Sequence, residues 1–173
     1  MGPIPDAPPT VRALVFRTPT PHDALPVWRL AEKAPHPDSH SPHFYARWFR
    51  DFAGTSLVAA VGRDVIGFLM GYRRPGSPDT YFVRQTAVSP HHRIPALGSH
   101  LLRAAAEREI AKGARYVEAG LTPGNRAAVD ACEQFAKRHR TGIHREALFP
   151  ASRFPGGHRD EVLYRIGPLG GAL

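Results

Sequence analysis

The spacing of apolar residues along the chain predicts helices and strands in a mixed order. Segments in which apolar residues recur at every third or fourth position predict amphipathic helices, and short alternating or continuous apolar runs predict strands. The resulting order, β-α-α-β-β-β-α-β-α-β, is neither doubly wound nor all-β, and it indicates an α+β fold with a mixed sheet flanked by helices. The predicted strands cover residues 11–17, 55–62, 65–73, 80–89, 115–122 and 161–167, and the predicted helices cover residues 21–34, 43–53, 96–112 and 126–138.

Turn residues support two of these boundaries. The tripeptide Gly62-Arg63-Asp64 separates two apolar runs and predicts a tight hairpin between the strands at 55–62 and 65–73. Gly113 follows the helix at 96–112 and is typical of a residue that ends a helix.

The segment 87–102, AVSPHHRIPALGSHLL, leads from a predicted strand through a turn into a predicted helix. A strand-loop-helix of this kind often holds a phosphate, because free backbone N–H groups and the positive end of the helix dipole point at the anion. Such loops usually contain glycines, whereas this one has Ile94, Pro95 and Ala96 before it reaches Gly98. We interpret it as a phosphate-binding loop whose sequence has drifted.

The length of 173 residues fits a single domain, which we place at residues 11–169, with disordered termini at 1–10 and 170–173. The chain has no apolar run of the length that a membrane span needs, and its Pro-rich start lacks the apolar core of a secretory signal. The one cysteine, Cys132, cannot form an internal disulfide. These features argue against a membrane partner and predict a cytoplasmic protein.

The formal net charge of +8 raises the question of nucleic-acid binding. The only lysines are Lys33, Lys112 and Lys137, so 20 of the 23 basic residues are arginines, and they are dispersed along the chain. A nucleic-acid binder concentrates its basic residues in a stripe, so we expect no nucleic-acid partner. Excess positive charge also suits a small polyanionic cofactor.

The order of elements, together with the loop Arg93-Ile94-Pro95-Ala96-Leu97-Gly98, resembles the GCN5-related N-acetyltransferase superfamily. In that superfamily the fourth strand binds the pantetheine arm of acetyl-CoA through its backbone, and a loop of pattern Arg/Gln-x-x-Gly-x-Gly/Ala wraps the pyrophosphate. The resemblance implies acetyl-CoA as the co-substrate of this chain. It assigns cofactor binding to Val88, Arg93, Ile94, Ala96, Leu97, Gly98, Ser99 and Asn125.

A narrower resemblance covers about residues 14–169, with its strongest signatures in RDFAGTS, GYRRPGSPDT and EVLYRIGPL. These segments look like the diaminobutyrate acetyltransferases of the ectoine pathway. The resemblance implies transfer of acetyl from acetyl-CoA to the γ-amine of L-2,4-diaminobutyrate, giving N-γ-acetyldiaminobutyrate for ectoine biosynthesis. It further implies a small-molecule amine substrate, a homodimer and no metal.

Three substrate positions of that family match Asp38, His158 and Glu161 of this chain. Acidic side chains suit the reaction, because a diamino acid is cationic and its reacting amine must lose a proton before it attacks the thioester. We assign catalysis to Glu161 and His158, with Glu161 holding the reacting amine or the α-amine, and substrate binding to Asp38. Direct and water-mediated removal of the proton both remain open, and Glu161 and His158 also fit an ordinary strand-end pair.

The chain departs from the family at several positions. His43 stands where the family usually has a tyrosine, Arg84 replaces a tryptophan on the fourth strand, and Cys132 replaces an aromatic residue. Ile94 and Ala96 replace the usual loop glycines. We assign His43 and Arg84 to the substrate pocket. The departures leave two alternatives open: an acetyltransferase of the same fold acting on another amine, and a catalytically weakened homologue that binds acetyl-CoA.

Local chemistry limits some of these assignments. Asn125 also fits the N-cap of the helix at 126–138, and Cys132 fits a core position better than a nucleophile. The ten histidines show no spacing typical of metal ligands, so we expect no metal site. Along the fourth strand, Phe82, Arg84 and Thr86 share one face by alternation, unless a bulge shifts the register.

Overall fold

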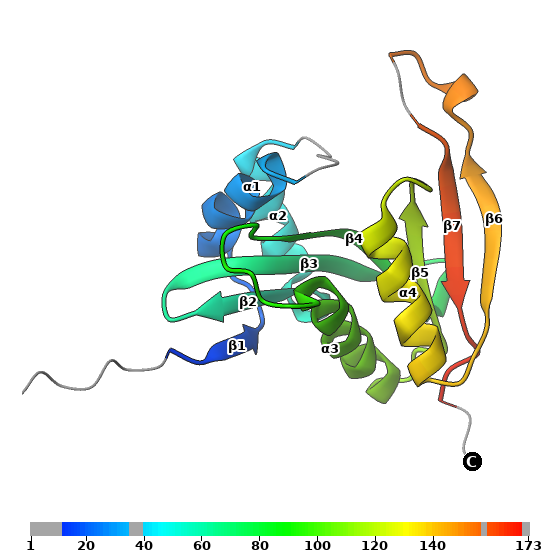
Figure 1. The fold of residues 1–173 in the computed structure, drawn as a ribbon, viewed down its shortest axis with the longest axis horizontal. Helices are drawn as coiled ribbons and strands as arrows, with labels where there is room; N and C mark the ends of the chain where they lie inside the picture. Colours follow the sequence, from blue (N-terminus) through cyan, green and yellow to red (C-terminus); the bar gives the residue numbers. More distant parts are fainter. Residues whose placement is uncertain (1–11, 35–39, 157–158, 171–173) are drawn as a thin grey trace, which may run out of the picture.

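The computed structural model describes residues 12–34, 40–156 and 159–170, which form a seven-stranded sheet with helices on both faces (Figure 1). The strands lie in the order β1-β2-β3-β4-β5-β7-β6. All neighbouring strands are antiparallel except β4 and β5, which are parallel and are joined by a crossover through helix α3. The strands are β1 (Leu14–Arg17), β2 (Leu57–Val61), β3 (Asp64–Arg74), β4 (Ser77–Val88), β5 (Tyr116–Leu121), β6 (Ile143–Phe149) and β7 (Glu161–Ile166).

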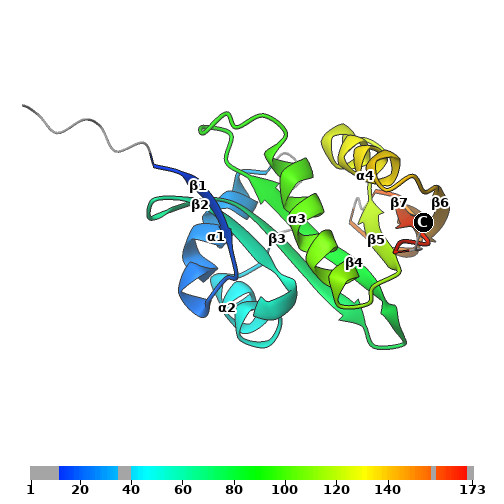
Figure 2. The ribbon, with the colours of Figure 1, turned by 90° about the horizontal axis from the view of Figure 1, so that it is seen from below.

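Within the described ranges, four α-helices cover the two faces of this sheet (Figure 2). One apolar core contains residues of α3 and α4 packed on the sheet, and a second contains residues of α1 and α2 on the opposite face. The α-helices are α1 (Ala24–Glu32), α2 (Pro42–Asp51), α3 (Leu97–Ala111) and α4 (Arg126–Arg138), and short 3-10 turns occur at η1 (Pro21–Asp23), η2 (Ala53–Thr55) and η3 (Ala151–Arg153).

The predicted α+β fold is confirmed, and so is the predicted hairpin. Strands β2 and β3 pair up to Val61 and Asp64, and Gly62 takes a φ of +61° in the turn between them. One strand was not predicted: β6 lies at the edge of the sheet and pairs with β7. Strand β4 also begins at Ser77, three residues earlier than predicted, because Ser77 pairs with Arg74 across a two-residue turn.

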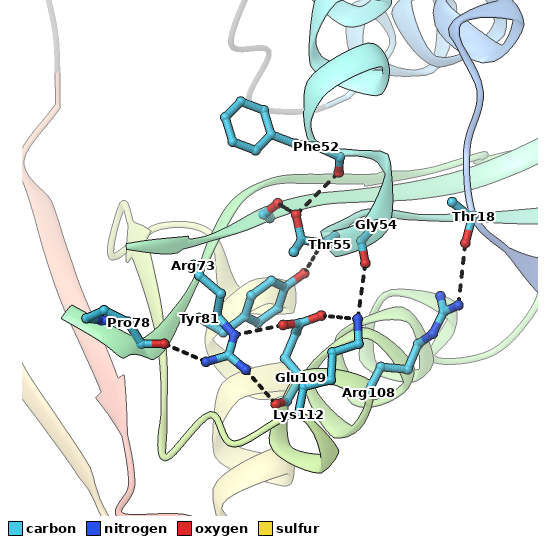
Figure 3. A network of polar contacts seen from close by, with 11 residues as sticks. Thr18, Phe52, Gly54, Thr55, Arg73, Pro78, Tyr81, Arg108, Glu109 and Lys112 are labelled. Atoms are coloured by element: carbon cyan, nitrogen blue, oxygen red, sulfur yellow. Dashed lines mark hydrogen bonds and ion pairs between the residues drawn. The ribbon is translucent and has the colours of Figure 1, made fainter. Parts of the chain in front are cut away.

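A polar network joins the segment after α2 to strands β3 and β4 (Figure 3). Thr55 Oγ1 donates a hydrogen bond of 2.6 Å to the carbonyl of Gly71, and the Tyr81 hydroxyl donates one of 2.6 Å to the carbonyl of Thr55. A Cβ at Gly71 would overlap the Tyr81 ring, so glycine is needed there. Burial raises the pKa of Tyr81, and its hydroxyl therefore keeps the proton that it donates.

The buried carboxylate of Glu109 on α3 is the charged centre of the same network. Its Oε2 lies 2.7 Å from Arg73 Nε, and its Oε1 lies 3.0 Å from Lys112 Nζ. Arg73 also donates to the carbonyl of Pro78 at 2.6 Å. The two cations offset the cost of burying a carboxylate, and they hold the C-terminal half of α3 on the sheet. The signatures RDFAGTS and GYRRPGSPDT therefore contribute to the fold, which sets the direction in which the N-terminus of α3 points.

Candidate active site

Strand β4 contains a bulge at Arg84. Val83 pairs with Gly71 and Gln85 pairs with Met70, so Arg84 is an extra residue that no residue of β3 opposes. A bulge places two successive side chains on one face of the sheet. Arg84 and Gln85 both contact residues on the side of α2, since Gln85 Oε1 accepts a hydrogen bond of 3.1 Å from the Tyr45 hydroxyl.

This bulge shifts the alternation along β4, so Thr86 does not share a face with Arg84. Ala87 belongs to the core under α1 and α2, whereas Tyr81 belongs to the core under α3 and α4. Period-two alternation then puts Thr86 on the α3 side, opposite Arg84.

Strands β4 and β5 part at the same point. Their parallel pairing runs from Thr80 with Tyr116 to Val83 with Ala119 and then stops, although β4 continues to Val88 and β5 to Leu121. From Arg84 onward, the edge of β4 that faces β5 has no strand partner in the described part of the chain. An extended ligand with amide groups can pair with such an edge as another strand would.

The loop after β4 and the first turn of α3 supply further free backbone groups. Arg93 and Ala96 take left-handed φ values of 41° and 55°, and Ala96 is the N-cap of α3 without a side-chain cap hydrogen bond. The N–H groups of Leu97, Gly98 and Ser99 come before the first intrahelical donor and have no partner within the helix. This geometry suits a diphosphate.

The side chains of the predicted cofactor residues lie in different environments. Val88 and Arg93 are exposed, whereas Leu97 is buried and Ile94 packs against the same core. Leu97 and Ile94 therefore offer a ligand their backbone only. A Cβ at Gly98 would meet nothing within 4 Å, so this glycine faces open space.

Asn125 is the N-cap of α4. Its Oδ1 accepts a hydrogen bond of 3.3 Å from the backbone N–H of Ala128. The capping interpretation of this residue is thus confirmed, and its contact with a cofactor stays a prediction.

Glu161 begins strand β7, and its carboxylate lies across Gly120 of β5. A Cβ at Gly120 would overlap Glu161 Oε1 and would lie 2.9 Å from Glu161 Cδ. Val162 and Tyr164 contact the core under α3 and α4, so alternation directs Glu161 to the opposite face of the sheet. Glycine at position 120 gives the carboxylate room to lie against the strand.

Arg84 and Glu161 flank the point at which the strands part. The last parallel pair is Val83 with Ala119, so Arg84 and Gly120 are the next residues on the two strands. Arg84 faces the same side of the sheet as Glu161. The structure thus brings a guanidinium and a carboxylate to the two sides of the opening, and their roles in binding a substrate stay predictions.

Arg84 is held by a residue that the sequence did not single out. Its Nη2 lies 3.0 Å from His40 Nε2. The His40 ring stacks on Phe44 of α2, with ring centroids 3.9 Å apart and an interplanar angle of 19°. No sequence pattern marked His40, but Gly120 had a signal, because glycine inside a strand often marks a close approach.

Three other predicted residues do not take part in this geometry as described. Asp38 and His158 lie outside the described residues. His43 is exposed on the first turn of α2, three residues beyond His40. The roles of these three residues stay predictions.

Cys132 is buried in the core beneath α4, where burial raises the pKa of its thiol to about 12. A thiol with that pKa is a poor nucleophile at neutral pH. Among the described residues, no group of three or more His, Cys, Asp or Glu side chains could hold a metal ion. None of the helices in the described ranges is long and apolar enough to cross a membrane.

Comparison with known proteins identifies the family to which the chain belongs. The profile of the acetyltransferase (GNAT) family matches residues 22–145. The chain belongs to the GNAT acetyltransferase family. Members of this family are acyltransferases that use acetyl-CoA, and the parted strands, the loop and the N-terminus of α3 lie within the matched residues.

Relatives within the GNAT family match most of the chain. The L-2,4-diaminobutyric acid acetyltransferase of Nocardia farcinica is 38% identical over 155 residues, covering 90% of this chain and 80% of that protein. The enzyme of the same name from Streptomyces coelicolor is 41% identical over 150 residues, covering 85% and 88%. The solved structure of diaminobutyrate acetyltransferase EctA from Paenibacillus lautus, in complex with L-2,4-diaminobutyric acid and coenzyme A, superposes with a TM-score of 0.87 at 29% identity and covers 94% of this chain and 99% of that chain.

Proposed function

We propose that this GNAT protein transfers the acetyl group of acetyl-CoA to the γ-amine of L-2,4-diaminobutyrate, giving N-γ-acetyldiaminobutyrate for ectoine biosynthesis. The observation that carries the proposal is the opening between β4 and β5, flanked by Arg84 and by the Glu161 carboxylate over Gly120. Relatives with this activity in their names, and the diaminobutyrate complex of the similar enzyme, support the choice of substrate.

The described residues fit acetyl-CoA in three ways. The free edge of β4 offers amide partners for the pantetheine arm, the first turn of α3 offers N–H groups for the pyrophosphate, and the open space at Gly98 admits a close approach. Arg93 adds a positive charge to the loop, and Asn125 lies at the start of α4, the helix that follows β5. Acetyl-CoA supplies the activated acetyl group as a thioester.

We assign the binding and deprotonation of the amine substrate to charged side chains. Glu161 holds an ammonium group of the substrate and takes up the proton of the reacting amine, directly or through water, together with His158. Asp38 attracts the other ammonium group. Arg84 receives the α-carboxylate in a forked contact, for which a guanidinium is well suited. We also keep His43, which is exposed on the first turn of α2, as a substrate-binding residue of this proposal.

A thiol-release assay with acetyl-CoA and a panel of diamines and amino acids tests the proposal. L-2,4-diaminobutyrate should be the preferred acceptor, and Glu161→Gln should lower kcat/KM at least tenfold, since a charge-assisted contact is worth about 1.5–3 kcal/mol. Glu161→Gln should leave the affinity for CoA unchanged. The matched control is Glu146→Gln, which removes an exposed carboxylate from β6. Full activity of Glu161→Gln would move the amine-binding role elsewhere.

A second candidate is transfer to a different amine by the same fold. Arg84 favours it, because a fixed positive charge stands at a position where the family resemblance implies an aromatic ring. The same panel decides between the two candidates: a better acceptor than diaminobutyrate supports the second. A chain that binds CoA but acetylates no acceptor would be a catalytically weakened homologue.

We further propose that the protein works as a homodimer in the cytoplasm. Strand β6 is an edge of the sheet whose outer side has no strand partner in the described part of the chain, and Phe149 and Phe154 beside it are 46% and 45% exposed. Such an edge favours association with a second copy. Cys132 as a buried thiol fits a reducing compartment. Sedimentation equilibrium of the protein and of Phe149→Ser tests the dimer.

A further inference from the structure

A groove between α3 and α4 begins beside the N-terminus of α3. It has a volume of about 250 Å³. Its floor includes the buried side chains of Ala131 and Phe135, and its rim is basic. The polar and basic residues that line it are Ser99, His100 and Arg103 of α3, and Gln134 and Arg138 of α4.

The side chains that line this groove carry an excess of positive charge. Glu107 is the carboxylate beside it, and its Oε1 lies 3.3 Å from Arg138 Nε and 3.5 Å from His139 Nε2. Arg103 is half-buried and forms no hydrogen bond or ion pair with any residue in the described ranges. Two of the residues that line the groove are arginines and none is acidic, and the guanidinium of Arg103 has all its donors available for an anion.

We propose that Arg103, with Arg138 beside it, binds the 3′-phosphate of coenzyme A. The inference rests on the proposed function, in which the pyrophosphate lies at the N–H groups of Leu97, Gly98 and Ser99. The 3′-phosphate is attached to the ribose next to that pyrophosphate. Arg103 follows Ser99 by one helical turn, about 6 Å along the axis at 1.5 Å per residue.

The chemistry of the two arginines differs, and so does their expected share of the binding. Arg103 can form two parallel N–H···O bonds to a phosphate without giving up a contact in the protein. Arg138 already shares the carboxylate of Glu107, so it contributes mainly its positive charge. The groove thus distinguishes a nucleotide with a 3′-phosphate from one without it, and it adds affinity away from the reacting atoms.

Calorimetric titration with CoA and with 3′-dephospho-CoA tests this inference on the full chain. The wild type should bind CoA about tenfold more tightly than dephospho-CoA, as expected for one charge-assisted contact. Arg103→Gln should bring this preference to near unity and leave the affinity for dephospho-CoA unchanged, which also shows that the variant is folded. Arg138→Gln should reduce the preference less. Lys137→Gln, which removes an exposed cation one residue away on α4, should keep it.

The outcomes separate the two proposals. An equal preference in wild type and Arg103→Gln, or no preference in the wild type, overturns the 3′-phosphate site and leaves the proposed function standing. Failure of the wild type to bind either nucleotide overturns the proposed function and the 3′-phosphate site with it.

Discussion

The carboxylate of Glu161 occupies the space that a side chain at Gly120 would need. The atoms that would meet a new Cβ are the far end of a flexible side chain, so Glu161 can move aside at little cost in stability. Gly120→Ala should therefore fold normally and should displace the carboxylate. We expect kcat/KM for diaminobutyrate to fall at least tenfold, with an unchanged Kd for CoA.

Steady-state kinetics and a thermal melt check the effect of Gly120→Ala. Gly98→Ala is a useful contrast, because it adds a methyl group at the cofactor end, where the structure has open space. That variant should weaken CoA binding and leave the KM for the amine unchanged. Normal kinetics in Gly120→Ala would show that the position of the Glu161 carboxylate is unimportant.

Arg84→Trp should change the selectivity for the acceptor amine. Removing the guanidinium takes away the proposed partner of the substrate α-carboxylate, so the preference for diaminobutyrate over putrescine should shrink. Arg84→Lys keeps the positive charge but loses the forked geometry and should fall between the two. The measurement is the ratio of kcat/KM values for the two amines, and an identical ratio in all three proteins would contradict a role for Arg84 in selectivity.

Ala96→Gly should tighten the binding of acetyl-CoA. Ala96 takes a left-handed φ of 55° beside the first turn of α3, where we expect its methyl group to crowd the bound pyrophosphate, and glycine would adopt this φ without that methyl group. We expect the KM for acetyl-CoA to fall several-fold. Ala104→Gly, in the middle of α3, should cost about 1 kcal/mol of stability without changing that KM. A higher KM in Ala96→Gly would show that the loop has adapted to alanine.

Asp23 should make the stability of the protein depend on pH. Burial acts to raise the pKa of Asp23, but hydrogen bonds to its carboxylate outweigh this effect and hold the pKa below its ordinary value. Arg17 donates from Nη1 and Nη2 at 2.8 Å each, and the backbone N–H of Thr20 donates as well. A lowered folded-state pKa means that this stabilisation is complete above about pH 4 and is lost as the pH falls further.

Thermal melts of wild type and Asp23→Asn check this dependence. At pH 7 the variant should lose about 1–3 kcal/mol, and the difference in Tm should disappear toward pH 2. The control is Asp51→Asn, which breaks an exposed ion pair with Arg50 and should change the Tm little. A Tm difference for Asp23→Asn that is the same at every pH would contradict this account.

Local signals explain which parts of the fold could be predicted from the sequence. The β2–β3 hairpin and the strand-loop-helix at 87–102 depend on turn residues and on short-range spacing, which the sequence displays. Strand β6 has no such pattern, because His144, Arg145 and Glu146 are all exposed. The strand is held by its pairing with β7 and by the contact of Arg145 with Glu133 of α4. Its existence depends on a distant partner.

The candidate site shows the same division. The resemblance to a family was enough to single out Glu161 and the loop as candidate site residues, because both lie in segments that are typical of that family. The bulge at Arg84 depends on the count of residues in β3 opposite it, and the contact with His40 joins two segments 44 residues apart. Neither relationship leaves a trace in the spacing of the residues concerned.

The parting of β4 and β5 has a mechanical consequence. Strands β1 to β4 form one part of the sheet, and β5 to β7 form the other. Four residue pairs, from Thr80 with Tyr116 to Val83 with Ala119, join the two parts. A pantetheine arm that pairs with the free edge of β4 would extend the hydrogen bonding beyond these four pairs, so the co-substrate would also connect the two parts of the sheet. We therefore expect bound co-substrate to make the junction of β4 and β5 more rigid. Amide hydrogen exchange in these two strands should slow as the bound fraction rises.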